Sequence, residues 1–372
     1  MLPLSTVINV SVATIPQGLA SFKLGNLLLV SSDAKPGSWG TSTYGVYKSP
    51  DQVLTDFGTG SETYLQAVAV FSQQPNILAN EGSLIVYPGQ SDLKVAFDTL
   101  GTSNLFPFCG IISTVYPASG SMKVLADDVQ AYNNKLLFLP SSTVGDVAGA
   151  FTTIKSASDD HTRCLYYGGT AQQARLFAAA YASRALGTNL AGSKTAITMQ
   201  FKNLATISAD ETISGTLLAQ CATAGVDVYV DIAGIPMVYS TGGNRFLDQV
   251  YNQIWLVTSL EVAAFNCLHG VANKIPQTED GMNLFKSALQ KVLQQGVVNG
   301  YLAPGVWTSP TTFGVQEDFI SNILQYGFYL YSLPVGLQST ADRGSRIAPP
   351  VQIAGKEAGA VHSGSILVYL NP

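Results

Sequence analysis

Apolar residues in the first ninety positions predict two short strands with a helix between them. Residues 26–32 (NLLLVSS) and 83–87 (SLIVY) are short apolar runs, which is typical of buried strands. Thr59 and Glu62 have the spacing of a capping box, so we expect the helix to begin there and to end before Pro75. Its predicted buried face consists of Tyr64, Leu65, Val68, Ala69 and Phe71.

Strands and helices alternate from about residue 105 to residue 200. The predicted strands lie at 108–115, 135–139 and 163–167. The predicted helices lie at 144–156 and 171–186, and the second is followed by Gly187, a typical residue after a helix end. This alternation indicates an α/β layer.

After residue 200 the pattern changes to two strands followed by two long helices. The strands are predicted at 225–232 and 235–240, and the helices at about 246–268 and 279–295. Thr278 and Asp280 mark the start of the second helix. Its predicted apolar face consists of Met282, Phe285, Ala288, Leu289, Val292 and Leu293. Polar residues interrupt the first helix, so we do not expect it to span a membrane.

Both ends of the sequence resemble strands. Apolar and polar residues alternate near the N-terminus, which is the period of a half-buried strand, and the C-terminus has a short apolar run. These segments can be edge strands of the chain's own sheet. Alternatively, they are arms that add to the sheets of neighbouring molecules. The candidate contact residues are Val7, Ile8, Val10, Val12, Ile366, Leu367, Val368, Tyr369 and Leu370.

Charge is scarce along this chain. Of 372 residues only 12% are charged, against about 25% in ordinary soluble domains, while the apolar fraction of 47% is ordinary. No charged side chain occurs in 1–22 or 292–316, and 358–372 has only His362 as an ionisable side chain. A free monomer normally carries more charge for solubility, so the composition favours a subunit of an assembly. The net charge of −5 argues against a nucleic-acid partner.

Residues 187–195 (GTNLAGSKT) resemble a phosphate-binding loop, but Ser193 displaces the lysine by one position. A helix also precedes this segment where such a loop needs a strand, so we expect a turn. Gly58-Thr-Gly60 lacks the third glycine of a dinucleotide motif. Neither segment predicts a cofactor.

Other candidate chemistry is scattered. His161, His269 and His362 are far apart in the sequence and have no metal-ligand spacing. The four cysteines contain no CxxC pair and are expected to be small buried residues. The acidic doublets, which favour solvated helix caps over acid/base pairs, are Asp127-Asp128, Asp159-Asp160 and Glu279-Asp280. We therefore expect no enzyme activity and no metal.

From Lys202 onward, the order of features resembles the contractile tail sheath proteins of bacteriophages. The most specific stretches are IPQTEDG with the later GYLAPGVW, and the closing ADRGSRIAPPVQIAGKEAGAVHSGSILVYLNP. Between them lie a short polar loop and YGFYLYSLP. MLPLSTVINVSV and the block at 44–72 also look like one subgroup of sheath proteins. The segment at about 91–200 matches only in pattern.

The resemblance implies a mixed α/β (α+β) sheath-type fold with extended terminal β-strand arms. The implied division is an N-terminal arm at 1–20, a discontinuous inner α/β core domain at 21–90 plus 201–357, an inserted outer α/β lobe at 91–200 and a C-terminal arm at 358–372. Lys356, beside the C-terminal arm, is expected either to pair with an acidic neighbour or to be solvated.

The resemblance also implies a function. Sheath subunits form stacked six-fold rings around a tail tube, exchange arms with one another, and contract to drive the tube through the host envelope. The implied partners are other copies of the chain, the tube protein, and baseplate and tail terminator proteins; no membrane insertion is expected. The implied location is the virion tail, assembled in the host bacterial cytoplasm. The alternatives are another tail or baseplate protein, or a small α/β nucleotide-binding enzyme that uses residues 105–200.

Overall fold

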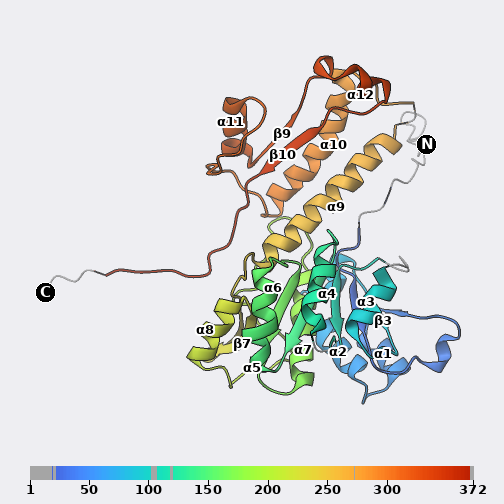
Figure 1. Ribbon diagram of the computed structural model, residues 1–372, viewed down its shortest axis with the longest axis vertical. Helices are drawn as coiled ribbons and strands as arrows, with labels where there is room; N and C mark the ends of the chain where they lie inside the picture. Colours follow the sequence, from blue (N-terminus) through green and yellow to red (C-terminus); the bar gives the residue numbers. More distant parts are fainter. Residues whose placement is uncertain (1–18, 20–21, 102–106, 118–119, 272, 369–372) are drawn as a thin grey trace, which may run out of the picture.

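The chain folds around a twisted eight-stranded sheet, with a pair of long helices standing on one end of it (Figure 1). The structure is a computed structural model that describes residues 19, 22–101, 107–117, 120–271 and 273–368. The large sheet and its covering helices occupy residues 22–246, and the helical unit occupies residues 247–357. None of the described helices is both long and apolar enough to cross a membrane.

The large sheet has the strand order β2-β3-β1-β4-β5-β6-β7-β8. Its edge strands β2 and β8 run antiparallel to their neighbours, and all inner pairs are parallel. The inner strands are buried on both faces, which is typical of parallel sheets. The strands are β1 (Leu27–Val30), β2 (Gly45–Tyr47), β3 (Leu84–Tyr87), β4 (Gly110–Ser113), β5 (Leu136–Ser141), β6 (Thr162–Tyr166), β7 (Asp227–Ile232) and β8 (Ile235–Tyr239).

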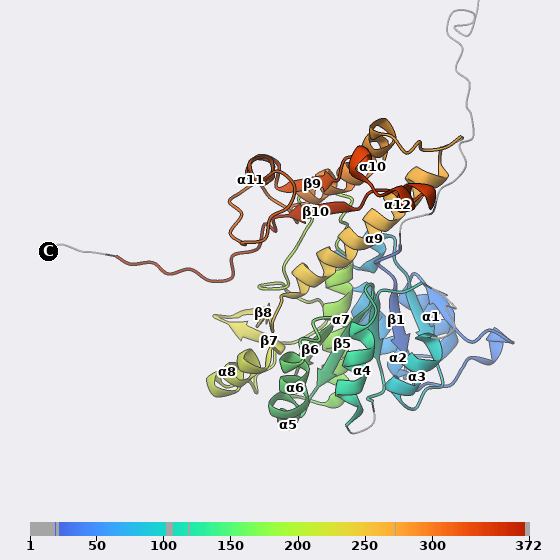
Figure 2. The same cartoon turned by 45° about the horizontal axis from the view of Figure 1, so that its top comes forward.

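Helices cover both faces of this sheet (Figure 2). Leu27 and Leu29 of β1 pack in one core with α2 and α7, whereas Leu28 and Val30 pack in a second core on the other face. The helices of the first face are α1 (Pro50–Phe57), α2 (Glu62–Phe71) and α7 (Ala171–Leu186), and those of the second are α3 (Leu93–Gly101), α4 (Ser121–Gln130), α5 (Val144–Asp146), α6 (Thr152–Ser156) and α8 (Gly215–Ala224). The π-helical turn η4 (Val147–Phe151) joins α5 to α6, so the helix predicted at 144–156 is present with one widened turn. The described residues also form the short 3₁₀ helices η2 (Gly37–Trp39), η3 (Ile77–Asn80) and η5 (Val335–Leu337).

The helical unit consists of an antiparallel pair with a small sheet against it. The first helix of the pair is α9 (Leu247–His269). Its buried residues all lie between Leu247 and Thr258, and the rest of the helix projects from the large sheet. Its partner α10 (Glu279–Val298) begins at the predicted cap, because Thr278 Oγ1 accepts a hydrogen bond from the Gly281 amide. The other elements are α11 (Gln316–Tyr326), α12 (Thr340–Gly344), β9 (Phe328–Ser332) and β10 (Val351–Gly355).

The predicted domain boundaries at residues 90 and 200 cut through the large sheet. Strands β1 and β3, from the predicted inner domain, pair directly with each other, and β1 also pairs with β4 of the predicted outer lobe. One continuous hydrophobic core extends from β1 through α7 to α9 and β9. Residues 91–200 are therefore part of the central α/β layer and form no separate lobe.

Helix α2 differs from its predicted cap and face. Ser61, not Thr59, caps it, since Ser61 Oγ accepts a hydrogen bond from the Tyr64 amide. The buried side chains include the polar Thr63 and Gln66, which bond to Asp33 and to the Ser113 carbonyl. Polar groups that find partners can be buried at low cost, so apolar spacing alone missed these two residues. Of the predicted face, Ala69 is buried, and Tyr64 and Phe71 are partly buried against the core.

Gly187 follows α7 as predicted, but for a different reason. Its φ of −68° is not the left-handed conformation expected after a helix. Instead, an added Cβ at Gly187 would lie 2.6 Å from the Asn76 carbonyl oxygen, so the close approach of two backbones excludes a side chain. Three of the four cysteines, Cys109, Cys164 and Cys221, are buried as predicted, and Cys267 is partly exposed.

A buried ion pair fixes the loop that leads into α9. Asp227 is fully buried at the start of β7, and its carboxylate lies 3.6 Å from the Arg163 guanidinium. The same carboxylate accepts hydrogen bonds from the Tyr181 hydroxyl at 2.6 Å and the Thr241 amide at 2.7 Å. Arg163 Nη2 donates to the Arg245 carbonyl at 2.7 Å. Two sites in the loop at 240–245 are thus attached to the sheet core just before α9 begins.

We expect the R163M substitution to destabilise the fold by about 3 kcal/mol, because it leaves the buried Asp227 carboxylate without its counter-charge. In the double variant R163M/D227N, part of the lost free energy of unfolding should be recovered, because the unpaired charge is removed. Urea denaturation of wild type, both single variants and the double variant gives the coupling energy. Additive effects would show that the two charges do not stabilise each other.

Candidate assembly interfaces

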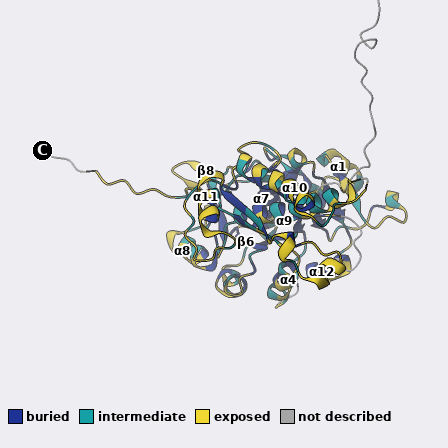
Figure 3. Cartoon of the chain, turned by 90° about the horizontal axis from the view of Figure 1, so that it is seen from above, coloured by how far each residue is buried: buried dark blue, intermediate teal, exposed yellow. Residues whose placement is uncertain are grey.

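Beyond Glu357 the C-terminal segment leaves the body as an extended chain that pairs with no strand among the described residues (Figure 1). Ile366, Leu367 and Val368 are 90%, 75% and 67% exposed, which is unusual for three successive large apolar residues. Within residues 356–368, only Glu357 takes part in a β-bridge, so 366–368 are not an edge strand of the chain's own sheets. Figure 3 shows the segment as exposed up to the end of the described chain.

The remaining predicted contact residues lie outside the described part of the chain. These are Val7, Ile8, Val10, Val12, Tyr369 and Leu370. Their role as arm contacts stays a prediction, as does that of residues 366–368.

A clamp formed by residues 356–358 holds the start of the C-terminal segment. Its backbone bonds to residues 301–303: Ala303 N donates to the Lys356 carbonyl at 2.9 Å, and Ala358 N donates to the Tyr301 carbonyl at 2.8 Å. The Glu357 carboxylate accepts from Gln249 Nε2 at 2.8 Å. It also accepts from the Tyr301 hydroxyl at 3.2 Å and lies 3.7 Å from Arg245 Nη2. We call this set the root clamp.

Lys356 itself is in no ion pair within the described chain. Its ammonium group donates to the Glu357 carbonyl at 3.4 Å, and its backbone amide donates to the Gly327 carbonyl at 2.8 Å. The backbone of Lys356 therefore holds the segment. The ion pair with an acidic neighbour, one of the two alternatives expected for Lys356, does not occur among the described residues.

A two-stranded sheet beside the clamp offers unpaired edges. Strands β9 and β10 pair antiparallel with each other, and no third strand joins them among the described residues. Helix α11 covers one face through a small aromatic cluster, in which the Phe319 ring centroid lies 5.3 Å from those of Trp307 and Tyr329. An edge with free N–H and C=O groups is what an incoming strand needs.

The N-terminal segment is attached at the far end of α9. The Asn266 side-chain amide bonds both backbone groups of Leu19, accepting from its N–H at 2.6 Å and donating to its carbonyl at 2.9 Å. In Figure 1 the far end of α9 and the described part of the C-terminal segment lie on opposite sides of the helical unit.

Lys135 packs against two aromatic rings, one of which belongs to Phe22 near the N-terminal segment. Its ammonium group donates to the Phe108 carbonyl at 2.6 Å and lies 3.7 Å and 5.6 Å from the ring centroids of Phe108 and Phe22. Burial lowers the pKa of Lys135 to about 8. The Phe108 and Phe22 rings favour a nearby cation and therefore oppose this shift.

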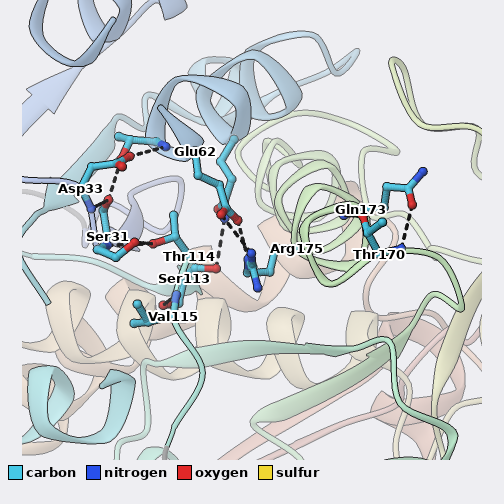
Figure 4. Close-up of polar contacts among 12 residues, drawn as sticks. Ser31, Asp33, Glu62, Ser113, Thr114, Val115, Thr170, Gln173 and Arg175 are labelled. Carbon is cyan, nitrogen blue, oxygen red and sulfur yellow. Dashed lines mark hydrogen bonds and ion pairs between the residues drawn. The ribbon is translucent and has the colours of Figure 1, made fainter. Parts of the chain in front are cut away.

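The carboxyl ends of β1 and β4 are the place where many α/β proteins bind ligands. Figure 4 shows that polar side chains there bond to one another. Ser31 Oγ lies 2.5 Å from Thr63 Oγ1, and Asp33 accepts hydrogen bonds from the amide and hydroxyl of Thr63 at 2.9 and 2.6 Å. Nearby, Arg175 forms a two-point ion pair with Glu62, one bond of which is 2.9 Å. These groups stabilise the packing of α2 against the sheet.

The segment at 187–195 caps a helix. The amides of Lys194 and Ala196 donate to the carbonyls of Val298 and Asn299 at the end of α10. Gln295 Nε2 donates back to the Leu190 and Gly192 carbonyls. A helix C-terminus carries partial negative charge, so this environment disfavours phosphate. The turn expected from the sequence is confirmed.

Two of the acidic doublets meet at Lys123, which pairs with Asp127 and lies 3.1 Å from Asp159. Asp159 is buried, so it is not the solvated helix cap expected from the sequence. His161 is buried before β6, which lowers its pKa, His269 stacks on Phe265, and His362 bonds to Thr198. Asp128 and Asp159 are in ion pairs with lysines of α3 and α4, and Glu279 accepts from the Val335 amide. Within the described residues, no group of three His, Cys, Asp or Glu side chains is arranged to hold a metal ion.

Comparison with known proteins supports the sheath resemblance. Residues 247–370 match the family described as "E217 tail sheath protein gp31-like, C-terminal domain". No curated protein matches the sequence.

Solved structures match over nearly the whole chain. They include the contracted PVC sheath complex of an extracellular contractile injection system (TM-score 0.62, 10% identity, 98% of this chain and 97% of that chain). They also include the contracted helical sheath of the anti-feeding prophage (TM-score 0.59, 12% identity, 100% of this chain and 99% of that chain). The baseplate of the same particle matches as well (TM-score 0.60, 12% identity, 98% of this chain and 100% of that chain). The chain therefore has the fold of subunits in these contractile assemblies, and the predicted fold class is confirmed.

We expect the lowered pKa of Lys135 to make the stability of the fold depend on pH. Because the pKa in the folded state lies below that of the unfolded chain, the cost of burying the ammonium group is present in full below pH 8. It is relieved as pH rises toward 10, so wild type should gain about 2 kcal/mol relative to K135M between pH 7 and 10. Urea denaturation at both pH values measures this difference. K23M removes an exposed lysine and should follow wild type, whereas parallel curves for wild type and K135M would contradict the assignment.

Proposed function

We propose that this chain is the structural subunit of a contractile tail sheath. It polymerises as stacked six-fold rings around a tail tube, and contraction of the sheath drives the tube through the host envelope. The observation that carries the proposal is the exposed apolar segment at 366–368, which extends from the root clamp beside a two-stranded sheet that no third described strand joins. The tail sheath match at 247–370 and the fold of two contracted sheaths support the same role.

The arms would connect subunits by strand addition. Backbone hydrogen bonds between an arm and a neighbour's sheet depend little on side chains and persist while the subunits rotate. Each arm would dock on a different surface from the one it leaves, and such a heterologous contact generates a helical lattice. The N-terminal arm at 1–20 and the C-terminal arm at 358–372 are the proposed connectors.

The energy for contraction would come from the contacts between subunits. Each Å² of apolar surface that becomes buried as the rings close on one another contributes about 25 cal/mol. This mechanism needs no nucleotide or metal, and the chain would act without catalysis. Its proposed partners are further copies of itself, the tube protein, and baseplate and terminator proteins of a virion tail, assembled in the host bacterial cytoplasm without nucleic acid or membrane insertion.

A second candidate is a baseplate or adaptor subunit. It is favoured by the similarity of this fold to chains in the anti-feeding prophage baseplate. Negative-stain microscopy of the purified protein separates the two. A sheath subunit forms long hollow cylinders alone, whereas an adaptor assembles only with its partners.

We expect deletion of residues 1–14 to give a folded monomer that forms no cylinders. These residues lie ahead of Leu19, the first described residue, whose backbone bonds to α9, so the core should retain its stability. Circular dichroism and sedimentation report the fold and the mass, and microscopy reports assembly. Normal cylinders from the truncated chain would contradict the role of the N-terminal arm.

We expect the double substitution I366D/V368D to abolish cylinders as well, because two charges on one side of a strand oppose its burial against a neighbour. V361D is the matched control. It places a charge on an exposed residue of the same segment, ahead of the predicted strand, and should still assemble. Equal assembly of all three proteins would contradict the role of the C-terminal arm.

A further inference from the structure

The C-terminal segment contacts the body again after the root clamp, at His362. His362 Nε2 lies 2.8 Å from Thr198 Oγ1, at hydrogen-bond distance. Its ring stands edge-on to the Phe246 ring, with the centroids 4.5 Å apart and the planes at 89°. A single side chain therefore makes the contacts that set the direction of the segment before it leaves the surface.

The chain between the root clamp and His362 is loosely packed. Gly359 has a φ of +67° with no atom near the position of a Cβ, and Val361 is 86% exposed. A cavity of about 50 Å³ lies under Gly359 and Ala360, bordered by Thr198, Asp248 and Asn252. No backbone hydrogen bond is formed by the described residues 359–368. This stretch can change direction without breaking a secondary-structure contact.

The two attachments differ in strength. The root clamp combines backbone hydrogen bonds with a carboxylate that has three partners, and charged hydrogen bonds are the stronger kind. The His362 contact is one hydrogen bond and one ring edge on a partly exposed side chain. His362 should therefore detach while the root clamp stays closed.

We propose that His362, Thr198 and Phe246 form a releasable latch, with Gly359 as the hinge between the latch and the root clamp. In the free subunit the closed latch holds the arm in one direction. Opening it lets the arm swing about Gly359 without separating from its own subunit. The use of this motion in a lattice, where neighbouring subunits turn relative to each other, rests on the proposed function; the latch itself does not.

Pulsed electron paramagnetic resonance on the unassembled full-length protein tests the latch. One spin label is placed at I366C on the arm and the other at K48C, an exposed site beside the large sheet, in a C267S background. With the latch closed, the distance distribution should have one dominant peak. H362A removes both latch contacts and should about double the width of that peak by freeing the arm to fluctuate.

Two further variants keep the test specific. T198V removes the hydroxyl on the body side and should broaden the distribution less than H362A does. H269A removes another histidine, on α9, and should leave the distribution as in wild type. Equal widths for wild type, H362A and T198V would overturn the latch. Because the measurement uses single subunits, that result is independent of whether the protein forms cylinders.

Discussion

The burial of the first turns of α9 determines how the whole molecule can move. Leu247, Tyr251 and Trp255 belong to the same hydrophobic core as β1 and α7. Separating the helical unit from the α/β unit would expose these side chains, at about 1.5–3 kcal/mol for each large apolar one. The Arg163–Asp227 pair holds the preceding loop in place as well. The body therefore behaves as one rigid piece, and large displacements are left to the C-terminal segment beyond the root clamp.

The long elements of the fold could be predicted because their apolar spacing is strong and their ends are marked. Helix α7 has the predicted bounds, and α9 and α10 lie within a few residues of theirs. Helix α11 lies in a stretch whose sequence predicts a polar loop. Only Phe319 and Ile323 of this helix are buried, so its apolar pattern is weak. Such a helix is stabilised by its tertiary packing and leaves little periodic signal.

The candidate interface could be predicted in part. The missing charge near the C-terminus pointed to a segment that leaves the body at the end of the described chain. The role of both termini as assembly arms stays a prediction. The anchors of those segments, Glu357 and Asn266, act by binding a few groups far away in the sequence, and no local pattern encodes such pairs. The domain division failed for a similar reason. Strand order is set by long-range pairing, so a boundary inferred from local character can fall inside a sheet.

The attachment of Leu19 by Asn266 has a consequence for how the protein can diverge. The amide binds only backbone atoms, and the Leu19 side chain is mostly exposed. Residue 19 can therefore vary widely across homologues without loss of the contact, while position 266 cannot. Insertions or deletions between this attachment and β1 would change the number of residues that connect the two, so the length of this stretch is constrained. Selection on this segment should thus act on length and spacing more than on residue identity.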